Sequence, residues 1–186
     1  MEDNGLDQTE DSLRDADAAG RIRARMLLAL GAFVLVWVFA DGLLIWGDLP
    51  NQIPTHFGGG GVPNSWGAKN AFNVFGPLVM GAIILLAMAL LRYRPRWYNF
   101  PGKEKAARLP LEQQAHVYAP LQESLAWLGS GEAIAMSLLS RQMWAAALQQ
   151  RHGISPVVFV VPTVVGIGAV ILGSVATSRR LRALGE

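Results

Sequence analysis

The sequence contains no cysteine among its 186 residues, and only 16% of its residues are charged. The first absence excludes a disulfide framework and any zinc site built on thiolates. The low content of charged residues, together with a hydrophobic content of 52%, distinguishes the chain from soluble domains, in which about 25% of residues are charged. No serine, histidine and acid set and no HExxH motif is present. We therefore predict a membrane protein that is not an enzyme and has no catalytic residues, cofactor or metal site.

Four apolar runs predict an all-α, polytopic membrane protein with four transmembrane helices. The runs cover residues 26–46, 72–91, 121–148 and 157–177. Each is long enough to cross a hydrocarbon core of roughly 30 Å at about 1.5 Å per residue. Basic residues precede the first run, separate the second from the third and follow the fourth. The positive-inside rule then places both termini in the cytoplasm, and it requires the third run to insert.

The charge pattern divides the chain into four segments. Residues 1–20 carry seven acidic residues and one arginine, so we expect a disordered acidic cytoplasmic tail. Residues 21–92 form a helix–loop–helix membrane unit with an outer loop at 48–71. Residues 93–120 form a polar cytoplasmic connector. Residues 121–186 form a second transmembrane helix pair with a basic C-terminal tail.

The outer loop is the most specific stretch of the chain. Its prolines and its run of four glycines predict neither helix nor regular strand. His56 lacks the neighbouring ligands of a zinc site, so we expect it to form a hydrogen bond across a compact turn. Lys69 is expected to neutralise a lipid head group or Asp48, and Trp66 to anchor the loop at the membrane interface.

Ten residues in this loop follow one another in a spaced pattern. They are Leu49, Pro50, Ile53, Pro54, His56, Phe57, Gly61, Trp66, Gly67 and Lys69. The pattern resembles the bacterial integral-membrane family called domain of unknown function 1648, over about residues 26–91. That family includes proteins similar to Sdp immunity proteins, which protect a bacterium from a secreted toxin and help signal its presence. The resemblance implies a multi-pass protein of the bacterial cytoplasmic (inner) membrane. The run Gly58–Gly61 departs from the family pattern, in which polar residues precede one glycine.

Three charged residues are predicted at membrane depth, namely Asp41, Glu132 and Arg141. A charge near the centre of a span costs about 2.5 to 3.5 kcal/mol unless it finds a partner. Asp41 and Arg141 each lie five residues from the centres of their runs toward the outer face, so we predict that they pair beneath the loop. Glu132, nine residues from Arg141, needs a different partner. The alternative is that the third helix ends near Ser140 and Arg141 reaches the interface alone.

Two classes of function remain. The first is a non-enzymatic envelope sensor or immunity-like factor, in which the outer loop meets an extracytoplasmic peptide or a membrane protein partner. The second is a small transporter or membrane-complex component that uses the buried Asp, Glu and Arg. The loop pattern could also record a structural need alone. The expected partners are the lipid bilayer and, in a homo-oligomer, further copies of the chain. No nucleic acid is expected, because the bases lie beside apolar runs.

Overall fold

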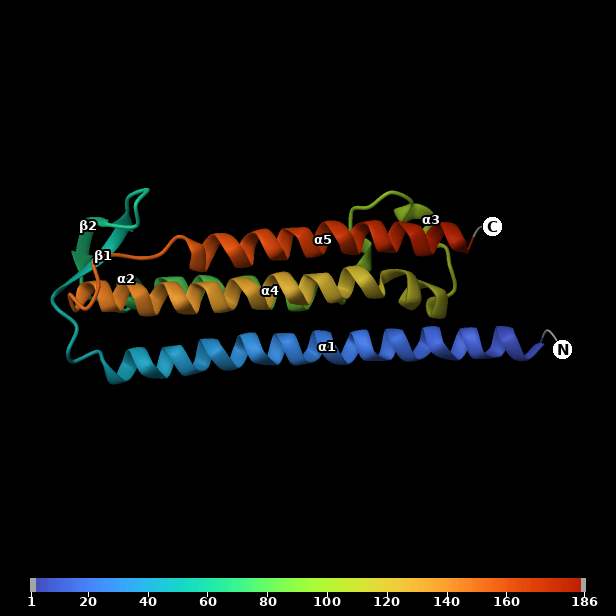
Figure 1. The fold of residues 1–186 in the computed structure, drawn as a ribbon, viewed down its shortest axis with the longest axis horizontal. Helices are drawn as coiled ribbons and strands as arrows, with labels where there is room; N and C mark the ends of the chain where they lie inside the picture. Colours follow the sequence, from blue (N-terminus) through green and yellow to red (C-terminus); the bar gives the residue numbers. More distant parts are fainter. Residues whose placement is uncertain (1–2, 185–186) are drawn as a thin grey trace.

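The computed structural model describes residues 3–184, which form a helical bundle with a β-hairpin at one end. Its elements are α1 (Asp3–Leu44), β1 (Gln52–Phe57), β2 (Pro63–Ala68), α2 (Ala71–Leu91), the 3-10 helix η1 (Pro95–Trp97), α3 (Lys103–Ala107), α4 (Leu111–Ala147) and α5 (Val157–Ala183). The four long helices run side by side along the long axis. The hairpin lies at one end of the bundle, and the start of α1 and the end of α5 lie at the other (Figure 1).

Helix α4 is the element on which the other long helices pack. It contacts α1, α2 and α5. About half of its side chains are buried, among them Glu132, Ser137 and Trp144. Glycines in the surrounding helices allow this close approach: a Cβ added to Gly81 would lie 2.9 Å from Met136 Cβ. The polar helix predicted over residues 121–148 is therefore the covered centre of the bundle.

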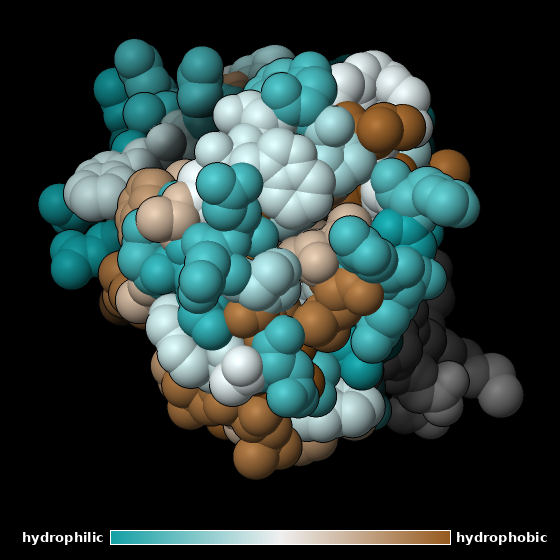
Figure 2. Space-filling view, turned by 90° about the vertical axis from the view of Figure 1, so that its left-hand side faces the viewer, coloured by the Kyte–Doolittle hydropathy of each residue, from teal (hydrophilic) through white to brown (hydrophobic). Residues whose placement is uncertain are grey.

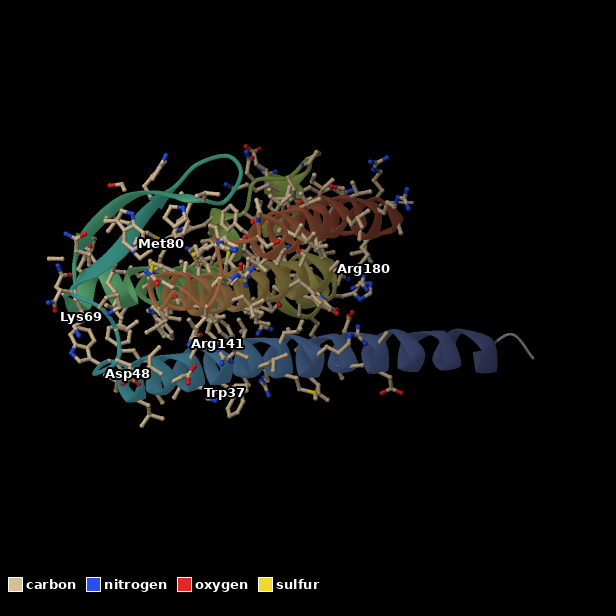
Figure 3. All side chains as sticks on the ribbon, turned by 60° about the vertical axis from the view of Figure 1, so that its left-hand side comes forward. Trp37, Asp48, Lys69, Met80, Arg141 and Arg180 are labelled. Carbon is tan, nitrogen blue, oxygen red and sulfur yellow. The ribbon has the colours of Figure 1, made fainter. Side chains whose placement is uncertain are left out.

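Helices α1, α2 and α5 each pack against α4 and turn apolar side chains outward. Within the described residues, the stretches 15–44, 71–91 and 157–183 are the three that are long and apolar enough to cross a membrane. Trp37 on α1 points away from the bundle (Figure 3), and Leu86 on α2 and Leu172 on α5 are also exposed. An apolar surface of this extent is normal against lipid and a liability in water. The structure is compatible with a membrane protein in which α4 has the least lipid contact.

The N-terminal segment differs from the disordered tail predicted for residues 1–20. Helix α1 begins at Asp3, and Met1 and Glu2 lie outside the described residues. Asp17 explains the order at the end of this segment. Its Oδ1 accepts a hydrogen bond of 2.7 Å from Arg180 Nη1 on α5, and its Oδ2 lies 2.6 Å from His116 Nδ1 on α4. The acidic composition indicated a solvated tail, but it could not reveal basic partners roughly 100 residues or more away.

The predicted connector at residues 93–120 is also more ordered and shorter than expected. Helix α4 begins at Leu111, and η1 and α3 precede it. Tyr98 and Phe100 pack edge-on against Tyr118 in a second hydrophobic cluster at this end of the bundle. Burial raises the pKa of Tyr98, which stays protonated and donates a hydrogen bond of 2.8 Å to the carbonyl of Arg92.

The outer loop at residues 48–71 contains two antiparallel strands, so the expectation of no regular strand is wrong. Ile53 pairs with Gly67 and Pro54 with Trp66, and the register is irregular between Pro54 and Phe57. Both strands of a two-stranded sheet are edge strands. Proline is tolerated in an edge strand where the backbone N–H would point away from the partner strand, and it is also tolerated at a bulge. Proline therefore excluded a central strand but not this hairpin.

The end of α4 gives a test of backbone strain. Gln149 has a φ of 59°, in the left-handed region. The N–H of Gln150 donates to the carbonyl of Ala145 at 2.9 Å and the N–H of Gln149 to that of Ala146 at 3.1 Å, which is a Schellman motif. Glycine adopts this conformation without a Cβ penalty. We expect Gln149→Gly to stabilise the purified protein by about 1 kcal/mol, measured as a rise in its thermal unfolding midpoint in detergent.

The neighbouring variant Gln150→Gly is the matched control. The φ of Gln150 is not positive, so glycine there adds only flexibility to the unfolded chain and should leave the midpoint unchanged or slightly lower. A midpoint that falls equally in both variants would show that Gln149 is not strained.

Candidate functional site

The base of the hairpin is fixed to the bundle by apolar side chains. Leu49, Ile53 and Pro54 are buried, and Leu49 and Ile53 belong to a cluster that includes Phe75 of α2 and Trp144 of α4. The ring of Phe75 meets that of Trp144 edge-on. These three residues of the loop pattern therefore close the end of the helical core.

Trp144 also connects α4 to α2 through its polar edge. Its indole Nε1 donates a hydrogen bond of 3.0 Å to the carbonyl of Val74, and its side chain is almost completely buried. On the other side, a Cβ added to Gly42 of α1 would lie 2.6 Å from the Trp144 ring. Three helices thus meet at one tryptophan below the hairpin. Trp144 could not be identified from the sequence, because an apolar run does not indicate which of its aromatic residues lies at a helix junction.

Lys69 holds the end of α1 to the hairpin. Its ammonium donates to the carbonyl of Leu49 at 2.8 Å and to that of Trp46 at 3.1 Å, and it lies 5.6 Å from the centre of the Trp46 ring. Carbonyls beyond a helix C-terminus lack intrahelical partners and attract cations. The predicted partners of Lys69 were a lipid head group or Asp48. The structure gives it these backbone carbonyls instead.

The tip of the hairpin touches the connection between α4 and α5. The N–H of Ile154 donates a hydrogen bond of 2.8 Å to the carbonyl of Gly61, whose φ is 76°. A Cβ at Gly61 would overlap the Ile154 carbonyl oxygen, whereas nothing lies within 4 Å of a Cβ built on Gly59 or Gly60. The structure therefore requires the fourth glycine of the run, which is the one that belongs to the family pattern.

The outer face of the hairpin is polar and exposed. His56 Nδ1 lies 2.5 Å from Asn64 Oδ1 on the opposite strand, which confirms the predicted hydrogen bond across a compact turn. Trp66 is 48% exposed, while Phe57 is half-buried against the core. Pro50 is also exposed. Figure 2 looks onto this end and shows hydrophilic residues spread over it, with hydrophobic ones between them and along its lower edge.

The pattern residue Gly67 lies in β2, between the two faces. A Cβ at this position would lie 2.8 Å from Asn73 Nδ2 and 2.9 Å from Thr55 Cγ2. Asn73 Nδ2 also donates a hydrogen bond of 2.8 Å to the carbonyl of Ala68. The glycine therefore makes room for the start of α2 against the hairpin.

Asp41 and Arg141 form the predicted ion pair. Arg141 Nε lies 3.3 Å from Asp41 Oδ2, and the two side chains are 51% and 31% exposed. Helix α4 continues to Ala147, so the alternative in which it ends near Ser140 is wrong. Figure 3 shows Arg141 where α4 meets α1.

The ion pair borders a groove of about 480 Å³, which we call the α1–α4 groove. Its polar lining comes from Asp41, Arg141, Gln142, Gln150 and Arg151, and its apolar lining includes Ile45, Leu138 and Leu148. Gln142 is already engaged, since its Oε1 accepts a hydrogen bond of 2.6 Å from the backbone N–H of Ser155. The groove thus combines cationic and apolar walls at the hairpin end of the bundle.

Glu132 lies apart from this groove. Its side chain is 93% buried within α4, and no base among the side chains of residues 15–184 forms an ion pair with it. In the same part of the chain, no three histidine, aspartate or glutamate side chains come close enough to hold a metal ion. The three charged residues predicted at membrane depth therefore form one pair and one separate carboxyl group.

Comparison with known proteins gives a family match but no established activity. Residues 27–81 match the family described as "Domain of unknown function (DUF1648)". A protein of Archaeoglobus fulgidus described as "Uncharacterized protein" is 31% identical over 86 residues, which are 43% of this chain and 46% of that protein. The chain thus spans about half the length of this relative. No solved structure matches. The matched segment contains the last part of α1, the hairpin and the first half of α2, so the predicted resemblance to this family is confirmed over these residues.

The glycine run gives a test of the hairpin's attachment. Gly61→Ala places a Cβ in the left-handed region and against the Ile154 carbonyl, so we expect a loss of about 2 kcal/mol or more. The loss would appear as a lower thermal midpoint in detergent and lower abundance in the membrane. Gly60→Ala is the matched control and should change stability by less than about 0.5 kcal/mol. Equal stability of the two variants would disprove the contact between the hairpin tip and Ile154.

Proposed function

We propose that this protein is a multi-pass membrane protein whose extracytoplasmic hairpin binds a peptide or a membrane protein partner, as a non-enzymatic envelope sensor or immunity-like factor. The observation that carries this proposal is that one set of hairpin residues packs against the bundle while another set is exposed. The pattern residues Leu49, Ile53, Pro54, Gly61 and Lys69 attach it to the bundle. Its outer face keeps polar and aromatic side chains free for a partner.

The outer face has the chemistry of a recognition surface. Trp66 offers a large amphipathic ring, and aromatic residues of this kind contribute most strongly to protein interfaces. His56 and Asn64 of the same hairpin add polar groups, which are oriented by their mutual hydrogen bond. A face held in one geometry pays less entropy on binding than a mobile loop. The hairpin therefore suits recognition of a partner better than chemistry on a substrate.

The attachments of the hairpin connect it to all four long helices. Strand β1 contacts α2 and α4, Lys69 holds the end of α1, and Gly61 is bonded to the connection that leads into α5. A partner on the outer face would thus act on the whole bundle at once. This arrangement supports a sensor, in which the bundle relays the occupancy of the hairpin to the opposite end.

The distribution of basic residues supports an extracytoplasmic hairpin. Arg92, Arg94 and Arg96 lie at the end of the bundle opposite the hairpin, together with Arg180 and Arg182 near the C-terminus. The hairpin end holds Lys69, Arg141 and Arg151. Under the positive-inside rule, this distribution supports cytoplasmic termini and four membrane crossings including α4. The cytoplasmic membrane of a bacterium is the location that this orientation and the family suggest.

A small transporter or membrane-complex component is the second candidate, favoured by the charged α1–α4 groove and the buried Glu132. A transport path would have to join these two features. Arg141 and Glu132 are separated by roughly 13 Å along α4, and Glu132 is not part of the groove lining. The tight packing of α4 between the two positions favours the sensor.

The orientation can be tested by cysteine labelling, because the natural chain contains no cysteine. Gly60→Cys lies in open space at the hairpin tip, and Glu104→Cys is exposed in α3 at the opposite end. In intact cells, a membrane-impermeant maleimide should label Gly60→Cys and leave Glu104→Cys unlabelled until the membrane is permeabilised. The reverse pattern would invert the orientation, and labelling of both in intact cells would exclude a membrane crossing between them.

The function can be tested by complementation of a deletion strain under a panel of membrane-active peptides and envelope stresses. A double variant, His56→Ala with Trp66→Ala, removes the exposed groups of the hairpin without touching its attachments. We expect normal abundance on a blot together with loss of protection.

The matched control is Tyr93→Ala with Trp97→Ala, which removes two exposed aromatic side chains at the other end of the bundle. It should keep protection. If the hairpin variant protects as well as the wild type while the deletion strain is sensitive, the outer face is not the contact surface.

A further inference from the structure

The α1–α4 groove lies where the apolar part of the bundle ends. Asp41 precedes the last residue of α1 by three positions, and Leu148 and Arg151 follow the end of α4. With the hairpin outside the membrane, this level corresponds to the boundary between hydrocarbon and lipid head groups. Ligands that reach the groove from the side of the bundle are therefore lipids.

The charge of the groove is positive. Arg141 and Arg151 line it against the single acid Asp41. The contact between Arg141 and Asp41 is a single approach of 3.3 Å rather than a bidentate pair, and a guanidinium carries five N–H donors. Arg141 is 51% exposed and Arg151 is also exposed. Two exposed guanidinium groups in the lining of one groove are suited to a phosphate group.

The rest of the lining is suited to an acyl chain. Ile45, Leu138 and Leu148 form apolar walls, and Leu138 is 41% exposed one helical turn below Gln142 toward the membrane centre. The exposed Trp37 lies on the outward face of α1 at a deeper level. The groove therefore opens onto the apolar flank of the bundle. A soluble anion would contact the arginines only, whereas a phospholipid would use both parts.

We propose that the α1–α4 groove binds an anionic phospholipid of the outer leaflet. Its phosphate lies between Arg141 and Arg151, and one acyl chain follows Leu138 toward the membrane centre. Asp41 holds Arg141 at the edge of the groove and limits the affinity, because its carboxylate repels the phosphate. This site is separate from the outer face of the hairpin and does not depend on what that face binds.

The test uses the full-length protein purified in detergent and incubated with equal amounts of phosphatidylglycerol and phosphatidylcholine. Bound lipids are counted by native mass spectrometry. We expect preferential retention of phosphatidylglycerol, and a loss of about tenfold in that retention for Arg141→Gln and for Arg151→Gln. Arg151 lies beyond the end of α4, so its variant removes charge without disturbing the helix pair.

Asp41→Asn separates this site from a purely structural ion pair. It frees the guanidinium and removes the repelling carboxylate, so retention of phosphatidylglycerol should stay equal or rise. A structural role predicts that Asp41→Asn and Arg141→Gln lower retention alike, and that result would overturn the proposal. Equal retention of both lipids by the wild type would overturn it as well.

Two further controls define the location and the source of the phosphate. Arg179→Gln removes an exposed charge at the opposite end and should leave the retention unchanged, and a tenfold loss there would show that any surface arginine suffices. Glycerol phosphate at equal concentration should not displace the lipid. Complete displacement would show that the groove takes a soluble phosphate and would exclude the lipid.

Discussion

Helix α4 has to keep its buried polar side chains away from lipid, and the arrangement of the other helices follows from that requirement. It carries Glu132, buried serines and Arg141, and an unpaired charge or polar group in hydrocarbon is costly. Ser137 and Ser140 donate to carbonyls one turn earlier in their own helix, which satisfies them within α4. The remaining cost is reduced because α1, α2 and α5 pack against the helix and bury about half of its side chains. Their own apolar surfaces are then free to face the membrane.

The hairpin completes the same cover at one end of the bundle. Without it, the ring of Trp144 and the start of α2 would meet water at the level where α1 ends. Ile53 and Pro54 fill this space, and Lys69 donates hydrogen bonds to the carbonyls of Trp46 and Leu49, which follow the end of α1. Most of the residues that carry the family pattern thus have a structural explanation. The exposed pattern residues His56 and Trp66 have a weaker one, which is why recognition is assigned to them.

The sequence predicted those features that depend on the length and hydropathy of a segment or on the depth of a residue in the membrane. Length and hydropathy located the apolar helices, and equal distance from the centres of two spans was enough to pair Asp41 with Arg141.

Prediction from the sequence failed where the structure depends on contacts between residues that are far apart in the chain. The helical state of residues 3–20 is supported by Asp17, whose partners His116 and Arg180 no local pattern connects to it. The hairpin was missed because proline and glycine indicate where a regular strand is weakened, but not where an edge strand tolerates them. The partners of Lys69 were missed because they are backbone carbonyls, and a sequence does not show which carbonyls lack a hydrogen-bond donor.

The hairpin and the α1–α4 groove share one physical element, the connection between α4 and α5. The N–H of Ile154 holds the hairpin tip, and the N–H of the next residue, Ser155, is held by Gln142 in the groove wall. Arg151 belongs to both the connection and the groove lining. A lipid in the groove and a partner on the hairpin would therefore each act on the same short segment. Coupling between the lipid and the partner requires that this segment have two arrangements that differ in affinity for each of them. The lipid must then change the affinity for the partner by the same factor as the partner changes the affinity for the lipid. If the segment has one arrangement only, the lipid would stabilise the bundle and leave recognition at the hairpin unchanged.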